Sequence, residues 1–329
     1  MKNLIKDLVE SYGPTGFETE VTNKIRTYIA DKVDECYVDA LGNLIARKKG
    51  SGKKVMFSAH ADEIGVIVTY IDDDGFLRFS NVGGLNLLTL LGGRVRFANG
   101  VIGVIGKEKG ELKDLTLDKL FIDIGAATKD EAQKKVSIGD FAVFHREFAD
   151  LGQRLVAKSM DDRIGCAVLV EAIRRLDHSD HDLYFVFSAQ EEVGLRGART
   201  AAYSIDPDLG IAIDVTRTGD TPEAPRMDVS LGKGAAIKVK DSSVIAHPKV
   251  KNLMVRLAEA DQIKYQLEVL EAGGTDAGAI HLTKSGVPSG TISIPCRYVH
   301  SPSEMVDLDD VENCVKLILA ICRDSLDEF

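Results

Sequence analysis

The chain has 329 residues, of which 44% are hydrophobic and 28% are charged, and this composition argues against a disordered chain, a fibrous repeat or a disulfide-stapled mini-protein. At about 150 residues per domain, the length predicts roughly two domains with a substantial core. With 41 Lys and Arg against 51 Asp and Glu, the net charge is −10, and no basic stripe is present, so we expect no nucleic-acid partner.

The predicted elements begin with two amphipathic helices, over residues 2–11 and 17–32. Acidic residues interrupt the first of them, so it is not expected to be a signal peptide. A hairpin around Leu41-Gly42-Asn43 follows. Residues 54–59 (KVMFSA) then form a short apolar run that is typical of a buried strand.

Residues 66–148 alternate apolar and polar side chains between turns that are rich in glycine, asparagine and aspartate. This pattern predicts many short strands and a small all-β domain. The most apolar stretch, residues 85–105, is interrupted by asparagine, threonine and arginine, so we expect no membrane span and no membrane partner.

After residue 152 the pattern changes to alternating strands and helices. The predicted helices cover residues 163–176, 195–203, 248–260, 275–283 and 308–326, and the predicted strands cover 182–189, 209–214, 265–270 and 290–295. Such alternation predicts an α/β fold with a mainly parallel sheet covered on both faces. We therefore predict one discontinuous α/β domain, residues 1–65 and 153–329, with a β domain of residues 66–152 inserted into it.

The five cysteines are odd in number, irregularly spaced and without a Cys-x-x-Cys pair. This usage is typical of a reduced protein, so we expect a cytoplasmic location.

Polar side chains follow the predicted strands where each one ends, and one more precedes a helix. In open α/β sheets, sites form just beyond the carboxyl ends of the strands, so we expect these side chains to lie together. They are His60, Asp161, Glu191, Glu192, Asp214 and His300. Each of them alone has an ordinary structural explanation, such as a core histidine, a helix cap or a solvated helix start, and only their combination indicates a site.

Imidazole and carboxylate together suit Zn²⁺, Co²⁺ or Mn²⁺, and a cysteine-free set suits a catalytic centre. His60, His300, Asp161, one glutamate and Asp214 supply three negative charges, so two divalent ions leave a net +1 that a hydroxide neutralises. Of the adjacent glutamates, one can ligate metal while its neighbour takes a proton from water. Asp62, two residues after His60, suits a carboxylate that orients the imidazole.

Six motifs in order resemble the M42 metallo-aminopeptidases, the deblocking, glutamyl or tetrahedral type, some of whose members have been labelled endoglucanases. The motifs are His60-x-Asp62-x-x-Gly65, Asp161-Asp162-Arg163-x-Gly165, Gln190-Glu191-Glu192-Val193-Gly194, Ala212-Ile213-Asp214-Val215-Thr216, Gly273-Gly274-Thr275-Asp276-Ala277 and Arg297-Tyr298-x-His300-Ser301. The similarity runs from Ser11 to the last predicted helix and implies a zinc-peptidase-like catalytic domain.

The resemblance also implies a role for each site residue. His60 and Asp214 would hold one ion, Glu192 and His300 the other, and Asp161 would bridge them, because family members can carry asparagine in place of Asp162. Glu191 would be the general base and Asp62 would orient His60. The implied cofactors are two divalent ions per chain, Zn²⁺ or Co²⁺. We expect Gly274, Thr275, Asp276 and Arg297 to shape the substrate pocket.

The implied function is hydrolysis of the N-terminal peptide bond of short peptides with a free N-terminus, through a water that bridges two metals. The inserted domain would mediate dimerisation, with dimers assembling into a twelve-subunit shell, although residues 107–115 are shorter than in many relatives. Three alternatives remain open: an acyl-amino-acid deacylase, a glycosidase and a non-catalytic peptide-binding assembly protein. Few aromatic residues and no tryptophan weaken the glycosidase alternative.

Overall fold

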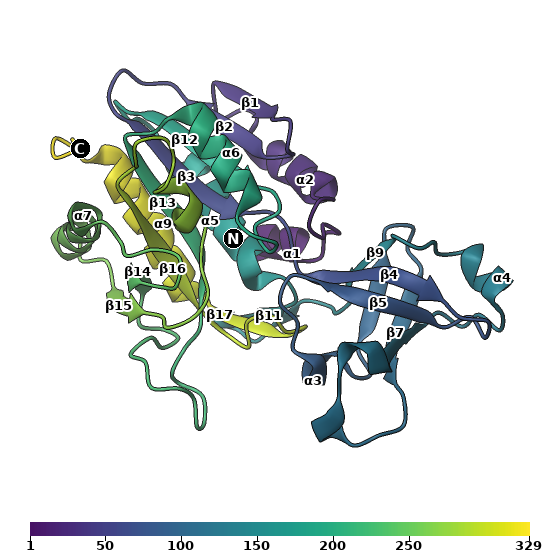
Figure 1. The fold of residues 1–329 in the computed structure, drawn as a ribbon. Coiled ribbons are helices and arrows are strands. Elements are labelled where there is room, and N and C mark those ends of the chain that lie inside the picture. Colours follow the sequence, from purple (N-terminus) through teal and green to yellow (C-terminus); the bar gives the residue numbers. More distant parts are fainter.

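An eleven-stranded sheet forms the larger part of the computed structural model, which describes residues 1–329 (Figure 1). In spatial order its main path is β1 (Glu35–Val38), β2 (Leu44–Lys48), β12 (Asp182–Ser188), β3 (Lys54–His60), β13 (Leu209–Thr216), β16 (Ser289–Arg297), β17 (Glu304–Asp307), β11 (Arg154–Ala157) and β10 (Ala149–Asp150). Strands β14 (Ala235–Lys240) and β15 (Tyr265–Val269) extend it from β16. The four central strands β12, β3, β13 and β16 are parallel, as predicted, and the strands that flank them pair antiparallel.

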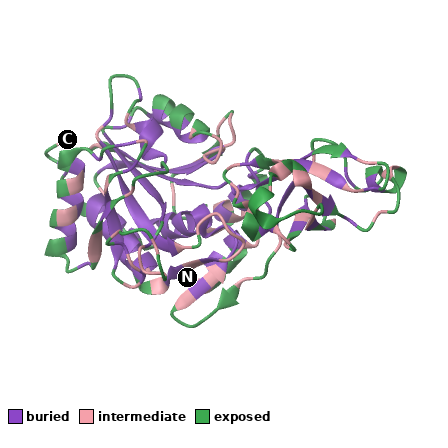
Figure 2. Cartoon of the chain, turned by 60° about the horizontal axis from the view of Figure 1, so that its bottom comes forward, coloured by how far each residue is buried: buried purple, intermediate pink, exposed green.

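Helices cover both faces of this sheet, as the continuous apolar strands predict. One face carries α1 (Lys2–Val9), α2 (Thr19–Ile29), α5 (Met160–Arg175), α7 (Pro248–Ala260) and α9 (Leu308–Arg323), and the other carries α6 (Arg196–Ile205) and α8 (Ala277–Ile280). Successive residues of one strand point to opposite faces. Phe57 of β3 therefore stacks on Phe185 of β12 in a core of 54 buried residues, whereas Met56 belongs to a second core of 11 residues. Figure 2 shows this buried interior.

A closed six-stranded antiparallel barrel forms the smaller part, beside the sheet in Figure 1. Its order is β4 (Gly65–Ile71), β5 (Leu77–Val82), β8 (Leu120–Asp123), β7 (Ile102–Lys107), β6 (Arg94–Phe97) and β9 (Phe141–Phe144), with short helices α3 (Leu87–Leu90) and α4 (Lys129–Gln133). Seventeen buried residues form its own core. The small β domain is confirmed as part of the fold, while the boundaries at residues 65/66 and 152/153 stay a prediction.

Several elements differ from expectation. The helix predicted over residues 275–283 covers only Ala277–Ile280, and the chain then turns through Lys284 and Gly286, which both have a positive φ. Strand β14 was not expected, since Lys238 interrupts its apolar pattern. That lysine is nevertheless buried, because Glu268 of β15 pairs with it at 2.5 Å. No helix has the length and apolarity needed to cross a membrane.

Candidate metal centre and active site

The structure brings the six predicted site residues together at one edge of the sheet. His60 is the last residue of β3, and Asp214 lies two residues before the end of β13. The Glu191-Glu192 pair follows β12, and His300 follows β16. Because parallel strands all end at the same edge, these segments, distant in sequence, converge there.

Asp161 occupies the centre of the cluster. It enters from the start of α5, where its own backbone is not yet helical. Its Oδ1 lies 3.0 Å from Nε2 of His60, and its Oδ2 lies 3.1 Å from Nε2 of His300. The two oxygens of one carboxylate thus face two different imidazoles.

Two groups of potential ligands share this aspartate. His60, Asp161 and Asp214 form the first, with 3.9 Å between His60 Nε2 and Asp214 Oδ1. Asp161, Glu192 and His300 form the second, with 3.4 Å between His300 Nε2 and Glu192 Oε1. Within each group the ligand atoms lie within 4.8 Å of one another. Two adjacent cation sites joined by a shared carboxylate have this arrangement.

The electrostatics of the cluster favour cations. Burial, reinforced by neighbouring carboxylates, raises the pKa of Glu191 and that of Asp214 well above the ordinary values. Burial lowers the pKa of the His300 imidazole, but the carboxylates of Asp161 and Glu192, 3.1 and 3.4 Å from its Nε2, outweigh burial and raise this pKa to about 11. Glu192 Oε1 is buried without a hydrogen-bond partner. Oxygen and imidazole donors with uncompensated negative charge fit divalent ions such as Zn²⁺ or Co²⁺.

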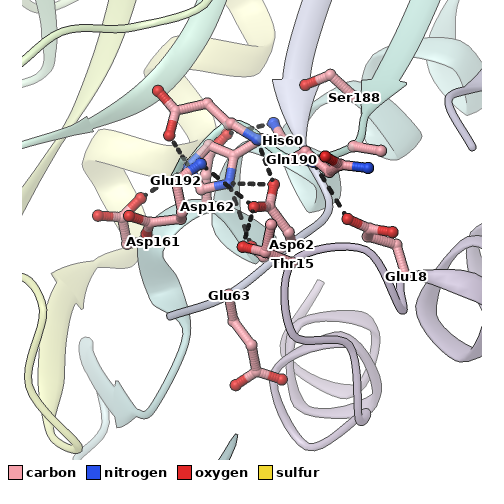
Figure 3. A network of polar contacts seen from close by, with 12 residues as sticks. Thr15, Glu18, His60, Asp62, Glu63, Asp161, Asp162, Ser188, Gln190 and Glu192 are labelled. Atoms are coloured by element: carbon pink, nitrogen blue, oxygen red, sulfur yellow. Dashed lines mark hydrogen bonds and ion pairs between the residues drawn. The ribbon is translucent and has the colours of Figure 1, made fainter. Parts of the chain in front are cut away.

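Asp62 holds the loop that carries the two glutamates. Its Oδ1 accepts a hydrogen bond from the backbone N–H of Glu191 at 2.9 Å, and its Oδ2 accepts one from that of Glu192 at 3.2 Å (Figure 3). The carbonyl oxygen of Asp62 lies 3.2 Å from Nδ1 of His60, which suits a hydrogen bond that orients the imidazole.

The N-terminal segment supports the same loop, which the sequence analysis did not anticipate. Thr15 donates its hydroxyl hydrogen to Asp62 Oδ2 at 2.7 Å. Glu18 Oε1 accepts from the backbone N–H of Gln190 at 3.1 Å, as Figure 3 also shows. Neither residue stands in a spacing that points to the site.

Glu304 of β17 is a third residue that the sequence analysis missed. It is buried, and its carboxylate accepts hydrogen bonds from the backbone N–H of Asp161 at 3.0 Å and from that of His300 at 2.7 Å. Glu304 therefore holds the start of α5, which carries Asp161, beside the loop after β16, which carries His300. Burial, followed by the Asp161 charge, raises its pKa to about 8.

The barrel also contacts the cluster, through the loop after β5. A Cβ added at Gly84 would lie 2.9 Å from Nδ1 of His300, and one added at Gly83 would lie 3.0 Å from Oε2 of Glu192. A side chain at either position would displace the His300 imidazole or the Glu192 carboxylate, so this loop packs directly against the cluster.

A cavity of about 270 Å³ opens beside the cluster, and Gly274 is among the residues that line it. The other three predicted pocket residues do not line it. Asp276 lies beneath, where its Oδ2 accepts from the hydroxyls of Ser58 and Ser188 at 2.6 Å each. Thr275 is buried and hydrogen-bonds Thr291. The Arg297 guanidinium is bound to Asp220, so contact of these three with substrate stays a prediction.

Comparison with known proteins gives consistent matches over most of the chain. A family model described as M42 glutamyl aminopeptidase matches residues 42–317. A protein of Acetivibrio thermocellus, whose aminopeptidase name is provisional, is 54% identical over 98% of both chains.

Two solved structures extend the comparison. Aminopeptidase APDkam598 of the archaeon Desulfurococcus kamchatkensis is 44% identical, with a TM-score of 0.95 over 98% of this chain and 94% of that one. The TET1 peptidase of Pyrococcus horikoshii, described as assembling into a tetrahedron or a large octahedral shell, is 35% identical, with a TM-score of 0.89 over 98% and 99%.

Proposed function

Since this chain belongs to the M42 glutamyl aminopeptidase family, a family of peptide-bond hydrolases, we propose that it is a dinuclear metallo-aminopeptidase that removes N-terminal residues from short peptides. The observation that carries the proposal is the pair of ligand groups that share Asp161, with Glu191 beside them.

The ligand assignment follows these two groups. His60 and Asp214 would hold one ion, and Glu192 and His300 the other, with Asp161 between them. A pair of Zn²⁺ or Co²⁺ ions held there would supply Lewis acidity for the scissile carbonyl and lower the pKa of a water molecule.

Glu191 is left as the proton acceptor, because it belongs to neither ligand group. Its Oε2 lies 3.9 Å from Nε2 of His60, and its side chain is 11% exposed at the cavity. The Glu191 carboxylate would accept a proton from the water that attacks the peptide carbonyl, and would deliver this proton to the leaving amine. Asp62 would keep it in place through the backbone hydrogen bond at 2.9 Å.

The free α-amine of the substrate would be held at the same charged edge, which explains action on N-terminal residues. We also propose that the chain forms homo-oligomers, dimers that assemble to a dodecamer, with the barrel as dimerisation domain. Support comes from the TET1 relative, which is described as a shell. A cytoplasmic location stays the prediction made from the cysteines.

Hydrolysis of a short peptide panel tests the proposal. Each peptide is offered with a free and with an acetylated N-terminus, with Zn²⁺ or Co²⁺ added and then chelated, and products are identified by mass. We expect cleavage of the free-amine peptides only, abolished by chelator. Cleavage of the acetylated set would indicate a deacylase. No peptide cleavage, with or without turnover of oligosaccharides, would overturn the proposal in favour of a glycosidase or a binding protein.

A further inference from the structure

Two arginines lie near the cavity, and they differ in whether their charge is already used. Arg297 is bound in a two-pronged ion pair, with its Nε 2.9 Å and its Nη2 2.7 Å from the two carboxylate oxygens of Asp220. Arg217 lines the cavity, is exposed, and makes no hydrogen bond or ion pair through its side chain. Of the two guanidinium groups, only the second is available to a ligand.

The other cation of the cavity wall is also neutralised. Lys238 is fully buried, with Nζ 2.5 Å from Glu268 and 3.4 Å from Asp241. Thr216, which neighbours Arg217, donates its hydroxyl hydrogen to the same Glu268 at 2.7 Å. This closed group of one ammonium and two carboxylates leaves no free positive charge behind the cavity.

Apolar side chains make up much of the remaining wall. They are Leu195, Val215, Leu270, Ala272 and Val299. A substrate group inside the cavity therefore meets the metal-binding edge, an apolar surface and one unpaired guanidinium. Arg217 directly follows β13, the strand that carries the predicted ligand Asp214, so both residues lie at the same end of this strand.

We propose that Arg217 is a specificity-determining residue that binds a carboxylate of the peptide substrate. This inference rests on the proposed aminopeptidase function. A planar guanidinium with five N–H donors matches a carboxylate in a two-pronged geometry, which no other unpaired group of this cavity offers. The carboxylate has two possible sources: the side chain of an N-terminal glutamate or aspartate, or the C-terminus of a di- or tripeptide.

Two isosteric substrate pairs distinguish these sources, with the metal-loaded full-length protein. The first pair is the p-nitroanilide of glutamate against that of glutamine, neither of which has a C-terminal carboxylate. The second pair is Leu-Gly-Gly against its C-terminal amide. We expect the ratio of kcat/KM, acid over amide, to be at least about tenfold in one of the pairs, corresponding to about 1.4 kcal/mol.

Substitutions at Arg217 then assign the preference to this residue. The same ratio should fall close to one in Arg217→Gln and below one in Arg217→Glu, and Arg217→Lys should restore part of it. Arg199→Gln is the matched control, because Arg199 is an exposed arginine of α6 that lies outside this cavity, and it should keep the wild-type ratio. A ratio taken within one variant is independent of how much active enzyme each preparation contains.

The possible failures are distinguishable. Ratios near one for both pairs in the wild type, with the amides still cleaved, overturn this inference and leave the aminopeptidase function in place. A wild-type preference that survives in Arg217→Gln overturns the assignment to Arg217. If the metal-loaded wild type cleaves none of these substrates, the proposed aminopeptidase function itself is overturned.

Discussion

Two carboxylates adjacent in sequence, Asp62 and Glu63, belong to buried clusters of opposite electrostatic character, and Figure 3 shows them pointing apart. Glu63 is 1% exposed and faces two buried cations, Lys158 at 2.5 Å and Arg163 at 3.4 Å. Asp62 supports the candidate metal centre, where Asp161, Glu191, Glu192 and Asp214 are paired only with imidazoles.

The difference separates a scaffold from a binding site. In the Glu63 cluster, called the paired cluster below, the carboxylate already binds two cations of the chain and needs no added ion, and removal of one partner leaves an unpaired charge in the interior. The metal-centre cluster, called the carboxylate-rich cluster below, has no lysine or arginine partner, so its negative charge is compensated only by protons or by added cations. Neutralising a carboxylate should therefore affect folding in the first cluster and function in the second.

The largest expected effect is that of Glu191→Gln in the carboxylate-rich cluster. Loss of the general base should lower kcat by about 10²–10⁴-fold, while both ions remain bound because Glu191 is not among the proposed ligands. Steady-state kinetics and metal analysis of the same preparation check this. A kcat within about tenfold of the wild type would remove Glu191 from the mechanism.

The isosteric change in the paired cluster, Glu63→Gln, should instead destabilise the fold. It leaves Lys158 and Arg163 buried without their carboxylate, and we expect the free energy of unfolding to fall by about 3–5 kcal/mol. Urea unfolding measures this. Asp150→Asn is the control, because the ion pair of Asp150 with Lys2 is exposed and should contribute less than about 1 kcal/mol. Equal small losses in both variants would contradict the distinction.

Metal binding should stabilise the folded chain only through the carboxylate-rich cluster. At about 100–1,000 times the dissociation constant, added Zn²⁺ should raise the free energy of unfolding by about 3–4 kcal/mol. Glu63→Gln should keep this increment, since separate sites add independently. His300→Ala should reduce it and lower the metal content. Two ions per chain in that variant would exclude His300 from the ligands.

The barrel also contributes to the carboxylate-rich cluster, because the loop after β5 contacts it. In Gly84→Ala the new Cβ would lie 2.9 Å from Nδ1 of His300, so the imidazole must move. We expect about a tenfold loss of kcat/KM, in line with the effect of small misplacements on catalysis. Leu88→Ala, a change of an exposed side chain in the neighbouring α3, should leave kcat/KM at the wild-type value. Equal kcat/KM in both variants would mean that the loop does not position His300.

The smallest expected effect is a pH dependence of the free energy of unfolding, caused by Lys158 of the paired cluster. Burial lowers the pKa of Lys158 from 10.5 to about 8. Between these values the folded chain binds fewer protons than the unfolded chain, so this lysine makes stability rise with pH. From pH 8.5 to 9.5 the free energy of unfolding of the wild type should rise by about 1 kcal/mol more than that of Lys158→Met. Parallel pH profiles of the two proteins would contradict this.

Local pattern accounts for much of what could be predicted. The apolar run that ends at His60 and the one that leads to Glu191 are strands buried on both faces, and such strands are parallel neighbours in this class of fold. Their carboxyl ends then converge whatever the loops between them do. The fold class and the candidate site residues at the strand ends follow from this one rule.

Tertiary structure alone decided the partners of these residues. Glu304 accepts from the backbone of Asp161 across 143 positions, and Asp220 occupies Arg297 across 77, while Arg217 stays free. The sequence by itself determines which segments form strands and where polar side chains leave them, because both depend on neighbours along the chain. Which carboxylate meets a cation, and which arginine stays unpaired, depends on contacts between distant segments that leave no periodic trace in the sequence.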